Sequence, residues 1–264
     1  MKIIWYIRSI IMTFFIPVLV LVLGPSAIIT KLIFNNRNTD TFFLNIWGRL
    51  NCWMFGVDVQ VEGRENIPDE GCLFLFNHSS FYDVFAICAA IPESRFGAKA
   101  ELFKIPVFSH TMRMMGTLPI ARNNREEVYK VYEEAKTRFH NKEKFALSPE
   151  GGRFYGPHLF PFKAGPFLFA MSAGVPVVPV VITGAYEILP KNHILPNKDR
   201  KNRTIHLKIL KPVPTTDFER ANRQQLQFTV YSKMDPIWSE YYDKHLMPAT
   251  VALPKATTKS ESTN

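Results

Sequence analysis

The pattern of apolar and polar positions separates an apolar N-terminal part from an alternating body. From Ser9 to Thr30 the sequence SIIMTFFIPVLVLVLGPSAIIT contains no charged residue. As a helix this stretch would be roughly 33 Å long, enough to cross the roughly 30 Å hydrocarbon core of a bilayer. A cleaved signal peptide would have a shorter apolar core, and a buried soluble helix would not be apolar on all faces. The pattern therefore favours a membrane anchor.

The way in which this segment meets the membrane is left open by the sequence. Pro17 and the Gly24-Pro25 pair can kink it, and the flanking positive charges are balanced. The next stretch, TFFLNIWGRLNCWMF, has large apolar residues at helical spacing, which suits either a membrane interface or a helix packed on a soluble domain. We predict membrane-anchoring helices over residues 1–56, either as a two-helix unit in one leaflet or as a span followed by an interfacial helix.

Strand-like and helical patterns alternate after Gly56. VDVQVEG and TIHLKIL alternate like half-buried strands, whereas CLFLF, FALS and VPVVPVVI are continuous apolar runs typical of buried strands. Helices are expected near 83–90, after the capping-box-like pair Asn124 and Glu127, and over FLFAMSAG up to Gly174. The prolines of VPVVPV indicate an edge strand or a bulge.

The alternation predicts an α/β fold, with a mixed, largely buried sheet flanked by helices and a membrane-associated helical segment before it. Thr216 and Glu219 are expected to open a C-terminal helix, which Pro236 breaks or restarts. We predict one domain over 57–249 and a disordered tail over 250–264.

Composition limits the class of partner. The 264 residues carry a net charge of +9, which indicates an anionic partner: nucleic acid, lipid head groups or a phosphorylated ligand. The three cysteines lack zinc-ligand spacing, so neither a metal nor a disulfide framework is expected. A nucleic-acid role lacks any recognisable module, so we expect no nucleic-acid partner. The basic run Lys198, Arg200, Lys201 and Arg203 fits a solvated loop or a patch for anionic groups.

The first candidate for chemistry is FNHSSFYDVF, directly after CLFLF. His78 and Asp83 would lie about 140° apart within one helix, so they meet only if His78 precedes the helix and Asp83 lies in its first turn. The alternative is structural, because Ser80 and Asp83 also fit a capping box.

Further candidates follow the other predicted strands. In GTLPIAR, Arg122 follows a predicted strand and precedes a capped helix. A guanidinium at this position can bind a phosphate, and a solvent-exposed arginine at a strand end is the alternative. SPEGGR places Glu150 and Arg153 around two glycines in a turn, either as part of a site or as a solvated ion pair.

In order and spacing, NHSSFYD, GTLPIAR, PEGGR and VPVVPV resemble the four blocks of the glycerolipid acyltransferase family. The resemblance implies that His78 is a general base and that Asp83 orients it. It also implies that Arg122, Glu150 and Gly151 bind the phosphate of the acceptor. Three more residues are predicted to bind substrate: Arg153, Lys99 and Glu101, the last two from the matching stretch KAELFKIP.

The resemblance further implies two substrates. The acyl donor is an acyl-CoA or an acyl-carrier protein, and the acceptor is a lysophospholipid, most simply 1-acylglycerol-3-phosphate. No cofactor is expected, and a bilayer is expected as partner, with the domain on its cytoplasmic side. Ser148 and Gly152 depart from the usual FPEGTR, and Ala121 replaces a common acidic residue, so the acceptor is less specified than the reaction. The alternatives are a different lysolipid acceptor or a membrane-anchored lipid-binding protein that has lost catalysis.

Overall fold

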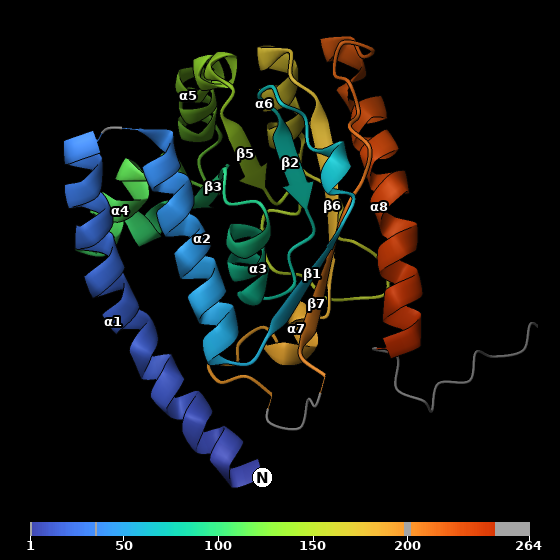
Figure 1. Ribbon diagram of the computed structural model, residues 1–264. Coiled ribbons are helices and arrows are strands. Elements are labelled where there is room, and N and C mark those ends of the chain that lie inside the picture. Colours follow the sequence, from blue (N-terminus) through green and yellow to red (C-terminus); the bar gives the residue numbers. More distant parts are fainter. Residues whose placement is uncertain (1, 35, 198–201, 246–264) are drawn as a thin grey trace, which may run out of the picture.

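The computed structural model describes residues 2–34, 36–197 and 202–245. Within these ranges seven strands form one sheet in the order β1-β7-β6-β2-β5-β3-β4 (Figure 1). Strands β2 to β6 are parallel to one another, whereas β7 is antiparallel to β6 and parallel to β1. The mixed α/β sheet is therefore confirmed.

The strands are β1 (Asp58–Glu62), β2 (Leu73–Phe76), β3 (Ser94–Lys99), β4 (Leu118–Ile120), β5 (Lys144–Leu147), β6 (Val177–Thr183) and β7 (Thr204–Ile209). The α-helices are α1 (Lys2–Phe34), α2 (Arg37–Met54), α3 (Tyr82–Ala90), α4 (Phe108–Met114), α5 (Arg125–Lys136), α6 (Ala164–Ala173), α7 (Ala185–Ile188) and α8 (Arg223–His245). Short 3₁₀ segments are η1 (Arg64–Asn66), η2 (Ala100–Lys104), η3 (Thr137–Asn141) and η4 (Arg220–Asn222).

Two hydrophobic cores lie on opposite faces of the sheet. Because side chains alternate along a strand, Phe74 and Phe76 of β2 join one core, and Leu73 and Leu75 join the other. Helices α2, α3 and α7 contribute to the first core, and α5, α6 and α8 to the second. The sheet is covered on both faces, as its continuous apolar runs predict (Figure 1).

Helix α1 exposes most of its apolar surface. Residues Thr13–Phe34 are long and apolar enough to cross a membrane, with a mean hydropathy of 2.2, and only 11% of that apolar window is buried. Phe14 and Leu32 are 75% and 73% exposed. This exposure rules out a buried soluble helix, and the helix continues through Pro17 and Pro25.

The amphipathic stretch after it forms α2, which packs on the domain. The Trp47 ring meets Phe85 of α3 edge to face, with centroids 4.9 Å apart. A Cβ on Gly48 would lie 2.6 Å from the backbone nitrogen of Ala89, so glycine permits this close approach. Trp53 at the end of α2 is 69% exposed. The packing interpretation therefore holds for one face of α2, while Trp53 stays accessible.

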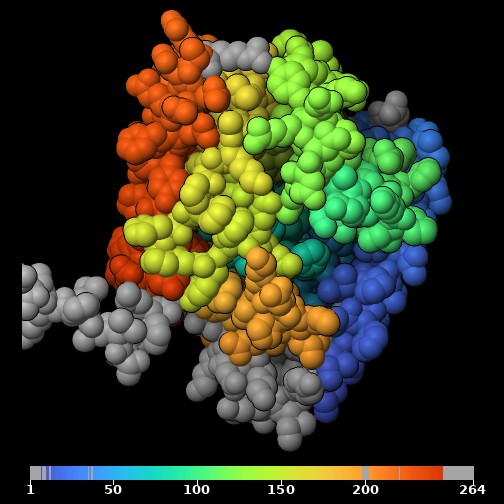
Figure 2. All heavy atoms as spheres, turned by 180° about the vertical axis from the view of Figure 1, so that it is seen from behind, coloured from blue at the N-terminus to red at the C-terminus, as the bar shows by residue number. Residues whose placement is uncertain are grey.

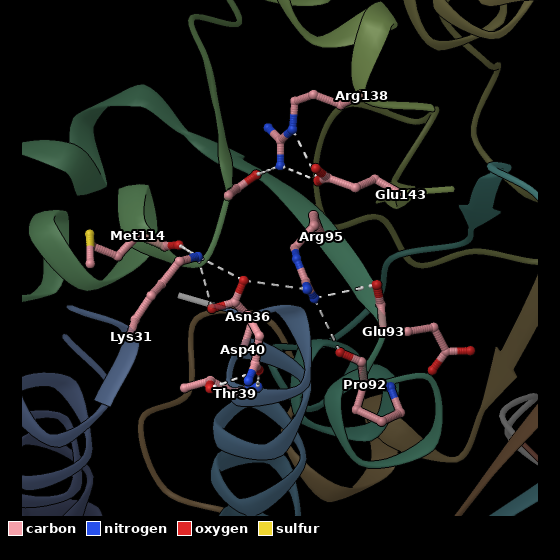
Figure 3. Close-up of polar contacts among 11 residues, drawn as sticks. Lys31, Asn36, Thr39, Asp40, Pro92, Glu93, Arg95, Met114, Arg138 and Glu143 are labelled. Carbon is pink, nitrogen blue, oxygen red and sulfur yellow. Dashed lines mark hydrogen bonds and ion pairs between the residues drawn. The ribbon is translucent and has the colours of Figure 1, made fainter. Parts of the chain in front are cut away.

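A buried ion network ties both N-terminal helices to the sheet (Figure 3). The carboxylate of Asp40 on α2 accepts two hydrogen bonds from Nζ of Lys31 on α1, at 2.8 and 2.9 Å. Nη2 of Arg95 on β3 lies 3.6 Å from the same carboxylate. Lys31 also donates to the carbonyl of Met114 on α4. Asp40 is only 4% exposed, and these two cations supply its counter-charge.

The prolines of VPVVPV do not mark an edge or a bulge, and that expectation is wrong. β6 lies between β7 and β2, with Pro179 opposite Leu75. The carbonyl of Pro179 accepts the Leu210 N–H at 2.8 Å. Proline has no N–H to donate in return. Because the β6–β7 pairing begins at the next residue, Val180, the missing donor lies at the end of the ladder. The sheet therefore loses one hydrogen bond at the end of a ladder.

Three smaller expectations also change. α8 begins at Arg223, not at Thr216, and passes through Pro236 without a break, because Leu226, Val230, Met234 and Trp238 bury one continuous face. Arg203 is 7% exposed and donates to the Phe55 carbonyl at 2.8 Å, so it is not part of a solvated loop. Lys198, Arg200, Lys201 and the predicted tail 250–264 lie outside the described residues.

Candidate functional site

The candidate residues converge because the strands before them are parallel. His78 follows β2, Arg122 follows β4, and the turn with Glu150 follows β5. Lys99 is the last residue of β3. The carboxyl ends of parallel strands lie at one edge of a sheet, which is where open α/β folds place ligands. Polar residues scattered over the sequence thus share one edge.

His78 and Asp83 meet as the spacing predicts. His78 lies in the turn after β2, Asp83 lies in the first turn of α3, and Nδ1 of His78 is 2.8 Å from Oδ2 of Asp83. The same Oδ2 accepts the backbone N–H groups of Ser79 and Ser80, each at 2.8 Å. Oδ2 of Asp83 therefore both contacts His78 and accepts the N–H groups before α3, so the two interpretations of the sequence do not exclude each other. Asp83 is fully buried, and the His78 side chain is 14% exposed.

Glu150 holds the backbone of the histidine from the opposite side. Its Oε1 accepts the His78 N–H at 2.7 Å, and its Oε2 accepts the Phe160 N–H at 3.1 Å. The carbonyl of His78 in turn accepts the Phe154 N–H at 2.8 Å. Burial raises the pKa of Glu150 to about 8, against the lowering effect of the two N–H groups, and the charge of Asp83 raises it further. With both oxygens occupied, Glu150 fixes the loop that carries His78.

Two residues beside His78 form buried hydrogen bonds that the sequence does not predict. The Asn77 amide bridges to β6, donating to the Ile182 carbonyl at 2.9 Å and accepting the Ile182 N–H at 2.7 Å. The Ser80 hydroxyl donates to the Leu189 carbonyl at 2.8 Å. Both side chains are almost fully buried. Their place beside His78 in NHSSFYD was the available signal, but a sequence does not say which backbone groups they bind.

The side of the site after β3 and β4 is charged and accessible. Nζ of Lys99 lies 3.3 Å from Oε1 of Glu101, and both side chains are about half exposed. Arg122 is exposed; desolvation lowers its pKa and Arg153 adds to that effect, whereas the nearby Glu101 raises it. The charges of these residues therefore act on one another: Lys99 pairs with Glu101, and both Glu101 and Arg153 affect the pKa of Arg122.

The two-glycine turn lies between these cations and the dyad. Gly151 has a φ of +75°, which glycine adopts without strain. A Cβ on Gly152 would lie 4.0 Å from Nη1 of Arg122, so the arginine lies over the turn. The segment after β5, which is yellow in Figure 2, covers the middle of this face between α8 and the η2–α4 segment. Among the described residues, no cluster of three or more metal-ligating side chains is found.

Comparison with known proteins agrees with this geometry. The family model described as Acyltransferase matches residues 58–183, which contain every candidate site residue. A chloroplast 1-acyl-sn-glycerol-3-phosphate acyltransferase, BAT2 of Brassica napus, is 30% identical over 156 residues, covering 58% of this chain and 45% of its own length. The chain therefore spans about half of that relative. A 1-acyl-sn-glycerol-3-phosphate acyltransferase from Salmonella typhimurium is 27% identical over 226 residues, covering 84% of this chain and 88% of its own length.

A solved structure shares the architecture. PlsC of Thermotoga maritima, titled a 1-acyl-sn-glycerophosphate (LPA) acyltransferase, superposes with a TM-score of 0.74 at 26% identity, over 89% of this chain and 97% of that one. The four sequence blocks, the paired His78 and Asp83, the family model and these relatives all agree. The chain thus resembles the glycerolipid acyltransferases in both its sequence blocks and its fold.

Proposed function

We propose that the protein transfers an acyl chain from an acyl thioester to the free hydroxyl of 1-acylglycerol-3-phosphate, which gives phosphatidic acid. Acyl-CoA or acyl-carrier protein is the donor, and no further cofactor enters the reaction. The observation that carries the proposal is the His78–Asp83 pair at 2.8 Å, at the carboxyl edge of the sheet, where Arg122 also follows a strand. Two similar proteins are named 1-acyl-sn-glycerol-3-phosphate acyltransferases, which supports this acceptor.

In this mechanism His78 is the general base. Because Nδ1 is held by Asp83, Nε2 is the nitrogen left to take the proton of the acceptor hydroxyl. The hydroxyl oxygen forms a bond to the thioester carbonyl carbon, and the carbon–sulfur bond then breaks. The imidazolium returns its proton to the leaving thiolate. Asp83 keeps the imidazole in the required tautomer and stabilises the imidazolium charge, as in other His–carboxylate pairs.

The lipid substrate explains the apolar surface. We propose that α1 holds the domain on a bilayer, with the catalytic edge on the cytoplasmic side. Exposed Phe14, Leu21 and Leu32 on α1 support this anchoring, as does exposed Trp53 on α2, since tryptophan favours the interface. An enzyme held this way meets its acceptor in the membrane.

The test is thiol release from oleoyl-CoA by the detergent-purified protein with 1-acylglycerol-3-phosphate, with products identified by mass spectrometry. His78→Ala should lower turnover by roughly 10²- to 10⁴-fold while leaving folding and membrane association intact. Transfer only to another lysolipid would replace the acceptor and keep the mechanism. Near-normal turnover in the variant would refute the role of His78. No release from oleoyl-CoA, and none from an acyl-carrier-protein donor in a second assay, would favour a lipid-binding protein.

A further inference from the structure

A lysine outside the four sequence blocks lies on the two-glycine turn. The position that a Cβ on Gly151 would take is 2.7 Å from both Cε and Nζ of Lys163, so the lysine fills the space where Gly151 has no side chain. The Lys163 backbone N–H donates to the carbonyl of Pro149 at 2.8 Å, which fixes the base of this side chain against the same turn.

Among the described residues, the ammonium of Lys163 has no counter-ion. Within residues 2–34, 36–197 and 202–245, no carboxylate forms an ion pair with it, and its side chain is exposed. Lys163 is also the N-cap of α6, and no side chain caps the first turn of that helix. A positive end of a helix and a free ammonium therefore lie together.

The turn is thus approached by cations from two sides. Arg122 lies over Gly152 and Lys163 over Gly151, and Arg153 is close enough to Arg122 to affect its pKa. The nearby carboxylate of Glu101 is already paired with Lys99. A phosphate monoester carries nearly two negative charges at neutral pH, whereas the phosphodiester of most lysophospholipids carries one. Several cations around one turn suit the more highly charged group.

Resting on the proposed function, we propose that Lys163 binds the phosphate monoester of the acceptor and makes the enzyme prefer it to phosphodiester lysolipids. Lys163 contributes a charge-assisted hydrogen bond to a phosphate oxygen that a diester cannot use as well, because its negative charge is smaller and its head group fills the turn. The residue determines specificity and leaves the proton transfer at His78 unchanged.

The experiment compares Lys163→Met and Lys163→Arg with the wild type, using 1-acylglycerol-3-phosphate, lysophosphatidylglycerol and 1-acylglycerol as acceptors. For Lys163→Met we expect kcat/KM with the phosphate monoester to fall about 10- to 100-fold through KM, and the values with the other two acceptors to change little. Lys163→Arg should recover most of the loss. Lys211→Ala is the control, because Lys211 is exposed beyond the end of β7, at the opposite edge of the sheet.

An equal loss with all three acceptors would overturn the proposal, as would a rise confined to the KM of oleoyl-CoA, which would assign Lys163 to a phosphate of the donor. A second measurement does not depend on turnover. Lys163 of the His78→Ala variant is labelled with an amine reagent in the presence of glycerol 3-phosphate or of glycerol, and the extent of labelling is measured by mass spectrometry. Protection by glycerol 3-phosphate alone supports the site even if the proposed reaction fails. Equal labelling in both solutions refutes it even if the enzyme is active.

Discussion

The carboxylate of Glu150 accepts the backbone N–H of His78 at 2.7 Å, so the turn after β5 holds the loop after β2. The imidazole is therefore fixed at two points, by Asp83 at its ring and by Glu150 at its backbone. The two acidic residues therefore hold different parts of His78: Asp83 contacts its ring, and Glu150 contacts its backbone.

Replacing Glu150 by alanine should impair both stability and turnover. The change leaves the N–H groups of His78 and Phe160 without their acceptor, and each unpaired buried donor costs about 1–3 kcal/mol. We expect a lower free energy of unfolding and turnover reduced at least 10-fold, measured by urea titration and thiol release. Glu101→Ala removes an exposed carboxylate from the same edge and is the matched control for stability. A Glu150→Ala protein as stable as the wild type would show that the Glu150 hydrogen bonds do not hold the loop that carries His78.

The stability of the protein should fall as the pH rises toward 8. Because burial raises the pKa of Glu150 to about 8, the folded state holds this proton more tightly than the unfolded chain does. The resulting stability is fully present below the ordinary glutamate pKa and is lost as the pH rises through about 8, at about 1.4 kcal/mol per pH unit at most. Urea unfolding at pH 5, 6.5 and 8.5 measures this slope. Glu150→Gln cannot titrate, and an unchanged slope in that variant would assign the effect to other groups.

Asp83→Asn should separate the two roles of this carboxylate. An amide oxygen can still accept the N–H groups of Ser79 and Ser80, so α3 should keep its N-terminus. The amide does not stabilise an imidazolium and favours the wrong tautomer, so turnover should fall on the order of 10²- to 10⁴-fold. Thermal unfolding and thiol release give the two readouts. A large loss of stability with little loss of activity would mean that Asp83 is only a cap.

Asp40→Ala should loosen the N-terminal helices from the sheet. Lys31 and Arg95 would lose a buried counter-charge, and breaking such a pair from one side costs about 3–5 kcal/mol. We expect proteolysis near residues 34–37 to become faster in detergent, with the thermal transition lowered. Asp58→Ala, at an exposed edge position of β1, is the control. Equal protease resistance of the two variants would show that apolar packing alone holds α1 and α2.

Much of this architecture follows from local signals. Asn124 caps α5 through the N–H groups of Glu126 and Glu127, and Gly174 ends α6 with a φ of +65°, both as predicted. The His78–Asp83 contact could also be predicted, because only a strand–turn–helix arrangement lets those two residues meet.

What could not be predicted depends on contacts distant in sequence. Glu150 and His78 are 72 positions apart, and no periodicity says which backbone N–H a carboxylate accepts. Arg203 looked like one of four solvated charges until the fold placed it against the carbonyl of Phe55. Pro179 argued for an edge because its missing donor is a local property, whereas its position at the end of a ladder is a property of the whole sheet. Lys163 had no motif to mark it.

The shared oxygen of Asp83 has a consequence for how the enzyme matures. Oδ2 closes the N-terminus of α3 and also holds the imidazole, so the imidazole acquires its orientation only when that helix end forms. A chain that has collapsed but lacks this helix end has no oriented histidine. Recovery of activity during refolding should thus coincide with hydrogen-exchange protection of the Ser79 and Ser80 amides.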